Sequence, residues 1–465
     1  MKKIRIIISV LLAAVLLICS AACAKTSPAD EQTQPADDTV QSSVSESPSD
    51  DKAEASEPQS TETTTAETES GTTDEQMTDA EDTEAESELT EETAQPEKEP
   101  ETVSPAANGV RYTSVDEAMS KMTLEEKVGQ LFVIMPEALY PSMKNKKFTQ
   151  SGVDYAFSLS DGMKETYAAY PAGGFILFGG NISSGDQLKG FTSQLHDLGP
   201  VRPFVYIDEE GGTVARIGNS GCISVPKYGN MQSIADTGDT DNAYAVGAGI
   251  GGYLKDYGID LDFAPVADVN TNPSNPVIGR RAFGSDPALA GDMVSAVIKG
   301  LHSQGVGSCI KHFPGHGDTN TDTHKAYAET LKTWDEIKNC EMIPFIDGIN
   351  AGTDMVMVAH ISAPNVTGDD TPATLSYTLV TEKLRRELGY NGVVTTDSMS
   401  MLAVADRYSP AEAAVTAIKA GIDIVLIPDD YIAAYNGVLD AVKNGEISEA
   451  RINESVRRIL TMKFN

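Results

Sequence analysis

The feature that most constrains the fold is a regular alternation, from residue 109 to the C-terminus, of short apolar runs with longer segments of helical periodicity. Eight runs have the length of a β-strand and are rich in Val, Ile and Phe, without alternating polar residues. Runs of this kind are typical of parallel strands that are covered on both faces. They are residues 131–135, 174–178, 204–207, 259–265, 306–310, 355–359, 393–396 and 422–427.

The segments between these runs are amphipathic, and two of them, 288–304 and 411–420, stop at a glycine, as helices commonly do. Eight strand–helix units in roughly 355 residues predict an α/β fold, a single (β/α)8 TIM-like barrel over 109–465, with a doubly wound sheet as the alternative. No G-x-G-x-x-G sequence opens the first unit, and no Walker A sequence occurs. The glycines of 247–252 lie inside a helical pattern, where they favour close helix packing.

The first 23 residues have the layout of an export signal. Three basic residues in 1–5 precede an apolar run, 6–18, that is too short to span a bilayer comfortably. Ser20-Ala21-Ala22-Cys23 resembles a bacterial lipobox, although Ser20 stands where that motif prefers Leu. We therefore expect a lipoprotein-type signal peptide over 1–23, lipidation of Cys23, and a protein anchored to the cell membrane and facing outside the cytoplasm. Ordinary cleavage that leaves Cys23 free is the alternative.

Residues 24–108 have the composition of a disordered spacer. They hold 25 Asp and Glu, three Lys, no Arg and no aromatic residue, which gives a net charge of −22. Such a Ser/Thr/Glu-rich stretch buries too little apolar surface to offset the entropy of ordering. We expect a disordered acidic tether between the anchor and the barrel, and a tail that only solubilises is a compatible interpretation.

The acidic excess also argues against nucleic acid as a partner. Residues 109–465 carry 44 acidic and 29 basic side chains, a net charge of −15. Phosphate contacts need a basic face, and this composition offers none.

The five cysteines do not form a disulfide framework. Two lie in the signal region, which leaves Cys222, Cys309 and Cys340, an odd number at irregular spacing and without a C-x-x-C pair. We expect these three thiols to be structural and buried in the fold.

Polar residues follow most of the predicted strands, and in a barrel these positions share the C-terminal rim where the chemistry takes place. A single polar strand end is as often surface as site, so the argument is the convergence of several. They are Asp208-Glu209-Glu210-Gly211-Gly212 after the third strand, Asp268 and Arg280-Arg281 after the fourth, 311–318 after the fifth, His360 after the sixth and Asp397 after the seventh.

The stretch from Lys311 to His324 is the densest in chemical groups, because it holds three of the six histidines of the chain. One interpretation is a metal site, but the histidines lie in a Gly-rich loop, without the helical spacing of H-E-x-x-H. A second is a structural cluster. The third is acid–base chemistry, in which Asp322 orients the His324 imidazole and leaves its other nitrogen to shuttle a proton.

Four motifs in this order resemble glycoside hydrolase family 3, in its β-N-acetylglucosaminidase branch with a His–Asp acid/base loop. They are D-E-E-G-G-T-V-A-R at 208–216, N-P-V-I-G-R-R-A-F-G at 275–284, K-H-F-P-G-H-G-D-T-N-T-D-T-H at 311–324 and L-R-R-E-L-G-Y-N-G-V-V-T-T-D-S-M-S-M at 384–401. The resemblance covers roughly 115–465. Two positions depart from typical members: Ser398 stands where they have Asp, and Thr213 where they often have Arg.

The resemblance implies roles for individual residues. Asp397 would be the catalytic nucleophile, and His324 paired with Asp322 would be the acid/base. Residues implied to contact the sugar are Asp208, Arg216, Arg281, Lys311 and His312. Neither a metal nor a cofactor is implied.

The function implied is that of a retaining exo-glycosidase that removes terminal non-reducing β-linked N-acetylglucosamine through a covalent intermediate on Asp397. Peptidoglycan fragments or chitin-type oligosaccharides would be its carbohydrate partners, and we expect a monomer. Another β-glycosidase activity and a β-N-acetylglucosaminide phosphorylase are alternatives. A non-catalytic, lipid-anchored sugar-binding protein is a more distant one, since a signal, a lipidated Cys23 and a tether would suit it equally.

Overall fold

The computed structural model describes residues 111–465, apart from 145, 149–151, 153 and 324–327. The signal peptide 1–23 with the expected lipidation site Cys23, the tether 24–108 and His324 lie outside the described residues, so the expectations for them stay predictions. No helix in the described part of the chain is long and apolar enough to cross a membrane.

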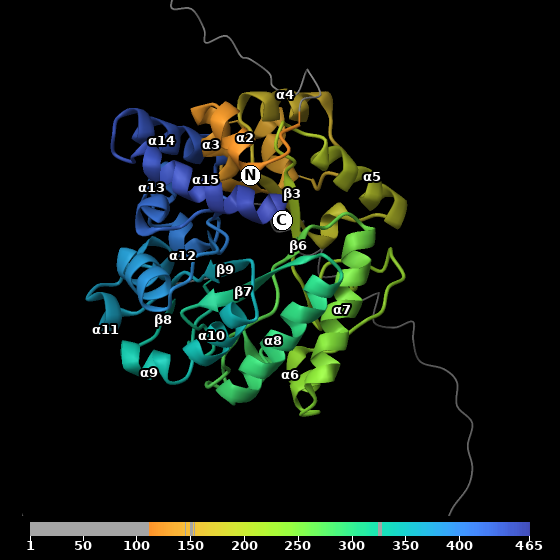
Figure 1. The fold of residues 1–465 in the computed structure, drawn as a ribbon, viewed down its shortest axis with the longest axis vertical. Helices are drawn as coiled ribbons and strands as arrows, with labels where there is room; N and C mark the ends of the chain where they lie inside the picture. Colours follow the sequence, from red (N-terminus) through yellow and green to blue (C-terminus); the bar gives the residue numbers. More distant parts are fainter. Residues whose placement is uncertain (1–110, 145, 149–151, 153, 324–327) are drawn as a thin grey trace, which may run out of the picture. The chain divides into compact units, whose positions relative to one another are not determined.

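Eight parallel strands form the centre of the fold (Figure 1), as the apolar runs predict. They are β1 (Phe132–Ile134), β2 (Gly174–Leu177), β3 (Phe204–Ile207), β6 (Leu261–Asp262), β7 (Gly307–Phe313), β9 (Met355–Val358), β11 (Val393–Thr396) and β12 (Val425–Leu426). Their order in the sheet is β11-β9-β7-β6-β3-β2-β1-β12. Each strand therefore lies beside the barrel strand that precedes or follows it in the sequence, and the last strand, β12, pairs with the first, β1. A parallel bridge between Thr395 and Ile424 links β11 to β12, so that the sheet is a nearly closed barrel.

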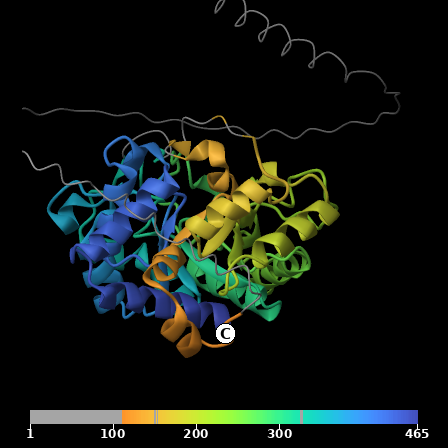
Figure 2. The same ribbon diagram turned by 90° about the horizontal axis from the view of Figure 1, so that it is seen from above.

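Helices surround this barrel (Figures 1 and 2). The longer ones are α4 (Asp161–Ala169), α5 (Gly185–His196), α7 (Thr240–Asp256), α8 (Pro287–Ser303), α10 (Met342–Asn350), the π-helical η8 (Thr378–Glu387), α13 (Pro410–Ala420), α14 (Tyr431–Lys443) and α15 (Glu449–Phe464). Shorter ones are α2 (Val115–Lys121), α3 (Leu124–Gln130), α6 (Met231–Ala235), α9 (Trp334–Lys338), α11 (Pro364–Thr367) and α12 (Leu402–Ala405). The alternation of strands and helices confirms the predicted (β/α)8 fold.

The predicted helix ends are confirmed at the two glycines. α13 starts where the Ser409 side chain accepts a hydrogen bond from the Glu412 N–H, and it ends at Gly421, whose φ of 117° suits a residue without Cβ. α8 begins with Pro287 and is followed by Gly305, at a φ of 73°.

Close packing of α7 on α8 explains the glycines of 247–252. A Cβ on Gly247 would lie 2.4 Å from the carbonyl oxygen of Val297 in α8. A Cβ on Gly300, in α8, would lie 2.4 Å from the carbonyl oxygen of Tyr244 in α7. Since a side chain at either position would collide with backbone, these glycines serve helix packing, as the sequence predicts.

The apolar core has two layers. Inside the barrel, side chains from alternate strand positions pack together, among them Val133, Ile176 and Met355. The rings of Tyr206 and Phe263 stack there with their centroids 5.2 Å apart. A larger layer lies between the barrel and the helices.

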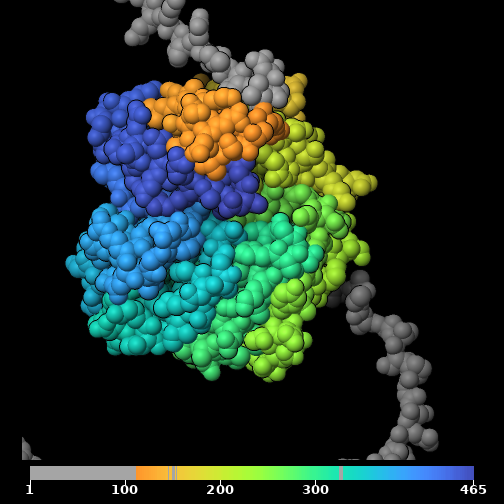
Figure 3. Space-filling model, viewed as in Figure 1, coloured from red at the N-terminus to blue at the C-terminus, as the bar shows by residue number. Residues whose placement is uncertain are grey.

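The two ends of the described chain lie side by side (Figure 3). The Tyr435 hydroxyl in α14 donates to the Glu125 carbonyl in α3, at 2.9 Å, and Arg457 in α15 pairs with Asp116 in α2, at 3.1 Å. These contacts place α2 and α3 against the C-terminal helices and complete the outer layer.

The three cysteines outside the signal region are free thiols. Cys309 is buried inside the barrel, as expected, and Cys340 is partly buried. Cys222 is exposed, so the prediction of a buried thiol is wrong there. It lies in an irregular loop after β5 (Val214–Ala215), outside the strand–helix units that form the core.

Candidate active site

A cavity of about 440 Å³ opens at the C-terminal ends of the barrel strands, within the ~300–1,000 Å³ range of small-molecule sites. Apolar side chains of the barrel interior, including Ile176 and Met357, lie at its inner end. Charged and polar side chains from the end of β7 and from the loops after β3, β6, β7 and β11 also line it: Asp208, Glu210, Arg216, Arg281, Lys311, His312, His316, Thr323, Asp397, Ser398 and Ser400.

The loop after β3 directs two of three consecutive acidic residues to the cavity. The chain reverses in the short hairpin of β4 (Glu209–Gly211) and β5, where Gly211 and Gly212 have φ values of 90° and 59°. Glu209 does not line the cavity. Its carboxylate accepts from the backbone N–H groups of Ile217, at 2.8 Å, and Gly218, at 2.7 Å, and so holds the hairpin in place.

Lys311 is the centre of a buried charge cluster. Its side chain is 3% exposed, and its Nζ lies 2.8 Å from Asp208 Oδ1 and 2.6 Å from Glu210 Oε1. A buried ammonium needs such partners, because its own desolvation is costly. The cation of β7 and the two anions that follow β3 are thereby fixed beside each other.

Two arginines extend the cluster. Arg281, from the loop after β6, binds Glu210 through Nε and Nη2, at 2.8 and 2.7 Å, in a bidentate pair. Arg216 reaches Asp208 at 3.1 Å and lies over the Phe178 ring, 5.1 Å from its centroid.

The cluster stays charged despite its burial. Burial raises the pKa of Asp208, but Lys311 and Arg216 outweigh it, so that the pKa lies below its ordinary value. Arg281 and Lys311 lower the pKa of Glu210 in the same way against burial. The pKa of Lys311 is raised by Asp208 and Glu210, against the effect of its own burial. The cavity therefore offers fixed cations and anions that can donate to and accept from sugar hydroxyls.

His312 is oriented by a buried carboxylate, Asp268. Its Nδ1 lies 2.7 Å from Asp268 Oδ2, and the other carboxylate oxygen accepts from the His316 N–H at 2.6 Å. Burial raises the pKa of Asp268, but the two histidines lower it below its usual value. An imidazole bound through Nδ1 has a fixed ring plane, which suits a residue that contacts substrate.

The loop after β7 folds around His316. The Nδ1 of this buried ring lies 2.7 Å from Thr319 Oγ1, and its Nε2 lies 3.2 Å from Thr323 Oγ1. The Thr323 carbonyl accepts from the Ala403 N–H at 3.4 Å, which joins this loop to the one after β11. Asp322 precedes Thr323 and is partly buried, while His324 lies outside the described residues.

Asp397 lines the cavity directly after β11 and is partly buried. Its N–H donates to the Val358 carbonyl of β9 at 2.8 Å, and its Oδ1 accepts from the Ser398 N–H at 2.7 Å. The Met399 N–H donates to the Leu426 carbonyl of β12, at 2.9 Å. Backbone bonds to both neighbouring strands thus fix the carboxylate.

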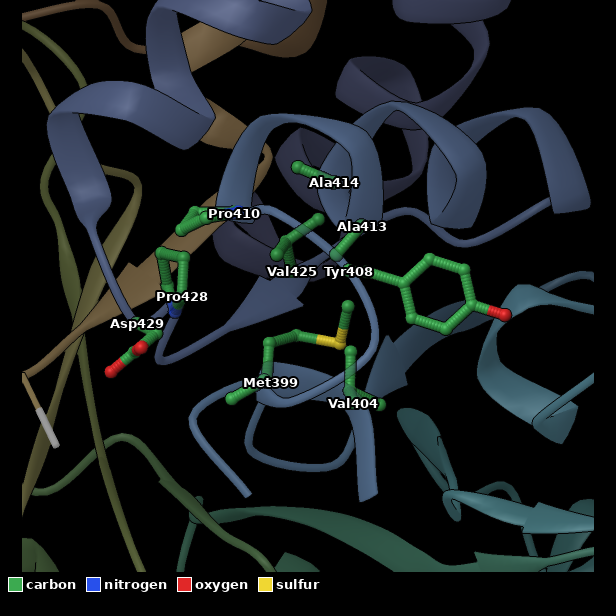
Figure 4. Close-up of a pocket in the computed structure, with 10 residues that line it drawn as sticks. Met399, Val404, Tyr408, Pro410, Ala413, Ala414, Val425, Pro428 and Asp429 are labelled. Carbon is green, nitrogen blue, oxygen red and sulfur yellow. The ribbon is translucent and has the colours of Figure 1, made fainter. Parts of the chain in front are cut away.

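Met399 anchors the same loop through its side chain (Figure 4). It packs among apolar side chains of α12, α13 and β12, including Val404, Ala413 and Val425. The space left between them is about 10 Å³, the volume of roughly one water probe. This pocket is therefore a packing contact that supports Asp397.

The structure brings most of the predicted residues together. Asp208, Arg216, Arg281, Lys311, His312 and Asp397 all line the cavity. Asp322 adjoins the lining residue Thr323. Reasoning from sequence placed Glu210 and His316 among the polar residues of the rim but did not single them out as site residues. The spacing of two between Asp208 and Glu210 is the pattern of side chains on one face of a strand and could have indicated Glu210.

Comparisons with known proteins identify a family and several relatives. Residues 123–462 match the family described as Glycosyl hydrolase family 3 N terminal domain. The chain is 32% identical over 376 residues to Beta-hexosaminidase A of Pseudoalteromonas piscicida, covering 74% of this chain and 62% of the relative. It is 37% identical over 285 residues to a Beta-hexosaminidase of Hydrogenovibrio crunogenus, covering 60% of this chain and 78% of the relative.

One solved structure is similar along the same region. It is a glycoside hydrolase family 3 beta-N-acetylglucosaminidase from Paenibacillus sp. str. FPU-7, with 35% identity and a TM-score of 0.66. The alignment covers 74% of this chain and 62% of that one. The chain thus spans less than two thirds of the length of this protein and of the Pseudoalteromonas relative.

Proposed function

The chain belongs to glycosyl hydrolase family 3, and we propose that it is a retaining exo-glycosidase that removes terminal, non-reducing β-linked N-acetylglucosamine. The observation that carries the proposal is the cavity that joins Asp397 to the charged cluster around Lys311. A glycosidase of this kind needs a carboxylate nucleophile beside groups that hold the hydroxyls of one sugar. The names of the relatives support N-acetylglucosamine as that sugar.

In the first step, an Asp397 oxygen attacks the anomeric carbon, and the bond from that carbon to the leaving oxygen breaks. His324 gives its proton to the leaving oxygen, and Asp322 stabilises the imidazole as its charge changes. The product is a glycosyl ester on Asp397 with inverted configuration. Thr323, between the two members of the dyad, lines the same cavity as Asp397, which supports this pairing of roles.

In the second step, His324 takes a proton from water while the water oxygen attacks the same carbon. The ester bond breaks, Asp397 is regenerated as a carboxylate, and the two inversions give net retention. The energetic role of the charged cluster is to bind the sugar hydroxyls while the ring distorts towards the transition state.

Action at a chain end is part of this proposal. The cavity is lined on the side of the barrel interior by Ile176 and Met357. A terminal sugar entering from the rim fits this arrangement. Peptidoglycan fragments and chitin-type oligosaccharides are the proposed substrates, in keeping with an exported protein anchored through Cys23.

A substrate panel with and without phosphate tests the proposal. We expect a chromogenic β-N-acetylglucosaminide to be hydrolysed at a rate that is independent of phosphate, with a β-glucoside as the matched control. A rate that requires phosphate and yields a sugar phosphate would show phosphorolysis. Preference for the glucoside would show another β-glycosidase, and binding without turnover would show a sugar-binding protein.

Deletion of 24–108 is expected to leave kcat/KM on a soluble substrate unchanged within about twofold, with an unchanged melting temperature. The reason is that a stretch with no aromatic residue and a net charge of −22 has no means of packing on the barrel. Steady-state kinetics and thermal melts of the mature and shortened chains check this. A large loss in either quantity would show that the tether docks.

In the His324→Ala variant, kcat/KM is expected to fall about 100-fold or more on substrates with poor leaving groups. The rate of the glycosylation step with activated aryl glycosides should fall less than about tenfold. A good leaving group departs without a proton, so the loss should follow leaving-group pKa. Asp322→Ala should show the same trend more weakly, since the imidazole survives without its orienting partner. A leaving-group series decides it: equal losses throughout would mean that His324 is not the acid/base.

A further inference from the structure

His360 is a fully buried imidazole that the proposed mechanism does not use. It lies two residues after Val358, the last residue of β9, and the Val358 carbonyl accepts a hydrogen bond from the Asp397 N–H. The end of β9 therefore brings both this backbone anchor and the imidazole to the loop that carries Asp397.

Two hydrogen bonds fix the His360 ring. Its Nε2 lies 2.8 Å from the Ser398 carbonyl oxygen, and its Nδ1 lies 2.9 Å from Thr374 Oγ1. A carbonyl only accepts, so Nε2 must carry a hydrogen. A neutral ring then accepts from the Thr374 hydroxyl through Nδ1, and both bonds are satisfied.

The Ser398 residue that His360 holds is the one that orients the nucleophile. Its N–H donates to Asp397 Oδ1 at 2.7 Å, while its carbonyl accepts from His360. The N–H and the carbonyl of Ser398 belong to successive peptide units that meet at its Cα, so a displacement of Ser398 would disturb both the bond to the carboxylate and the bond to the imidazole. A charge-assisted bond of this kind depends on its direction.

We propose that His360 is a positioning residue that, through Ser398, holds the Asp397 carboxylate in the geometry required for attack on the anomeric carbon. This inference rests on the proposed function, because it assigns a role within that reaction. A displacement of about 1 Å at a reacting group can cost roughly 100-fold in rate.

Four variants test the inference. His360→Phe keeps the ring and removes the donor, whereas His360→Gln can still donate from a position near that of Nε2. Thr374→Val removes the partner of Nδ1. The control is His302→Phe, which changes a histidine in the last turn of α8 that bonds to Asp354 and Ser308, away from the cavity.

The measurements are the melting temperature, KM and kcat on an aryl N-acetylglucosaminide, and the rate constant of trapping by a fluorinated N-acetylglucosaminyl fluoride at saturation. For His360→Phe we expect trapping and kcat to fall about 100-fold, with KM within about threefold. The trapping rate constant and kcat of His360→Gln should recover to within about fivefold of the wild type, and those of Thr374→Val should lie between the values of the two His360 variants. For His302→Phe both quantities should match the wild type.

Some outcomes would overturn the inference. If the wild type is trapped and active and His360→Phe is trapped at the same rate, the role of His360 is wrong while the proposed function stands. Equal losses in His360→Phe and His360→Gln, in step with a fall in melting temperature, would show a purely structural role. If the wild type is neither trapped nor active on any glycoside, the proposed function itself fails.

Discussion

In the Asp397→Asn variant, the kcat of hydrolysis is expected to fall by at least about four orders of magnitude, since removal of a covalent nucleophile has effects of this size or larger. An amide is a poor nucleophile and cannot stabilise the oxocarbenium-like transition state with a negative charge. The substitution keeps the shape of the side chain and the backbone bonds from Asp397 to Val358, so the fold should be retained.

Trapping with a fluorinated glycosyl fluoride and peptide mapping checks the assignment directly. The wild type should carry the sugar on the peptide that contains Asp397, and Asp397→Asn should carry none. Asp208→Asn is the matched control: it alters a carboxylate of the same cavity, should weaken sugar binding, and should still be labelled on Asp397. A label on Asp208 or Glu209 would refute the role of Asp397.

The barrel could be predicted from the sequence because parallel strands buried on both faces are continuous apolar runs. All eight predicted runs contain or overlap a strand of the sheet, and the glycines after α8 and α13 end those helices as expected. The exposed Cys222 shows where this reasoning fails. Its loop has no periodicity, so nothing in the local sequence states whether it is buried.

The acidic and basic residues that line the cavity could be predicted because short motifs place them at strand ends. Asp268 and His360 were also named at strand ends, but the residues with which they pair could not be found in this way. Asp268 orients His312 from 44 positions away, and His360 reaches the carbonyl of Ser398 across 38. The closure of the barrel brings such pairs together, and no local sequence pattern indicates them.

The Lys311→Met variant is expected to lose about 3–5 kcal/mol of unfolding free energy, because removal of one partner leaves buried charges without compensation. Asp208 and Glu210 both lie within 2.8 Å of Nζ, and both would keep their negative charge with fewer cations nearby. The same change should lower kcat/KM by about 1,000-fold, since a buried charged contact at the substrate site is lost. Denaturant titration and steady-state kinetics measure the two effects.

The difference in unfolding free energy between the wild type and Lys311→Met should depend on pH through the carboxyl groups of Asp208 and Glu210. In the wild type their folded-state pKa values lie below the ordinary range, so their stabilising effect is present above about pH 4 and is lost as pH falls. Without Lys311 these pKa values rise towards or above the ordinary range. The gap in unfolding free energy between wild type and Lys311→Met should therefore be largest near neutral pH and shrink below about pH 4.

A double variant separates charge balance from sugar binding. Lys311→Met combined with Glu210→Gln removes one anion with the cation, and we expect it to regain part of the lost unfolding free energy. Activity should stay low, because the ammonium that we propose to donate to the sugar is still absent. Recovery of activity together with stability would instead mean that Lys311 only supports the fold. An unchanged melting temperature in the single variant would contradict the buried cluster itself.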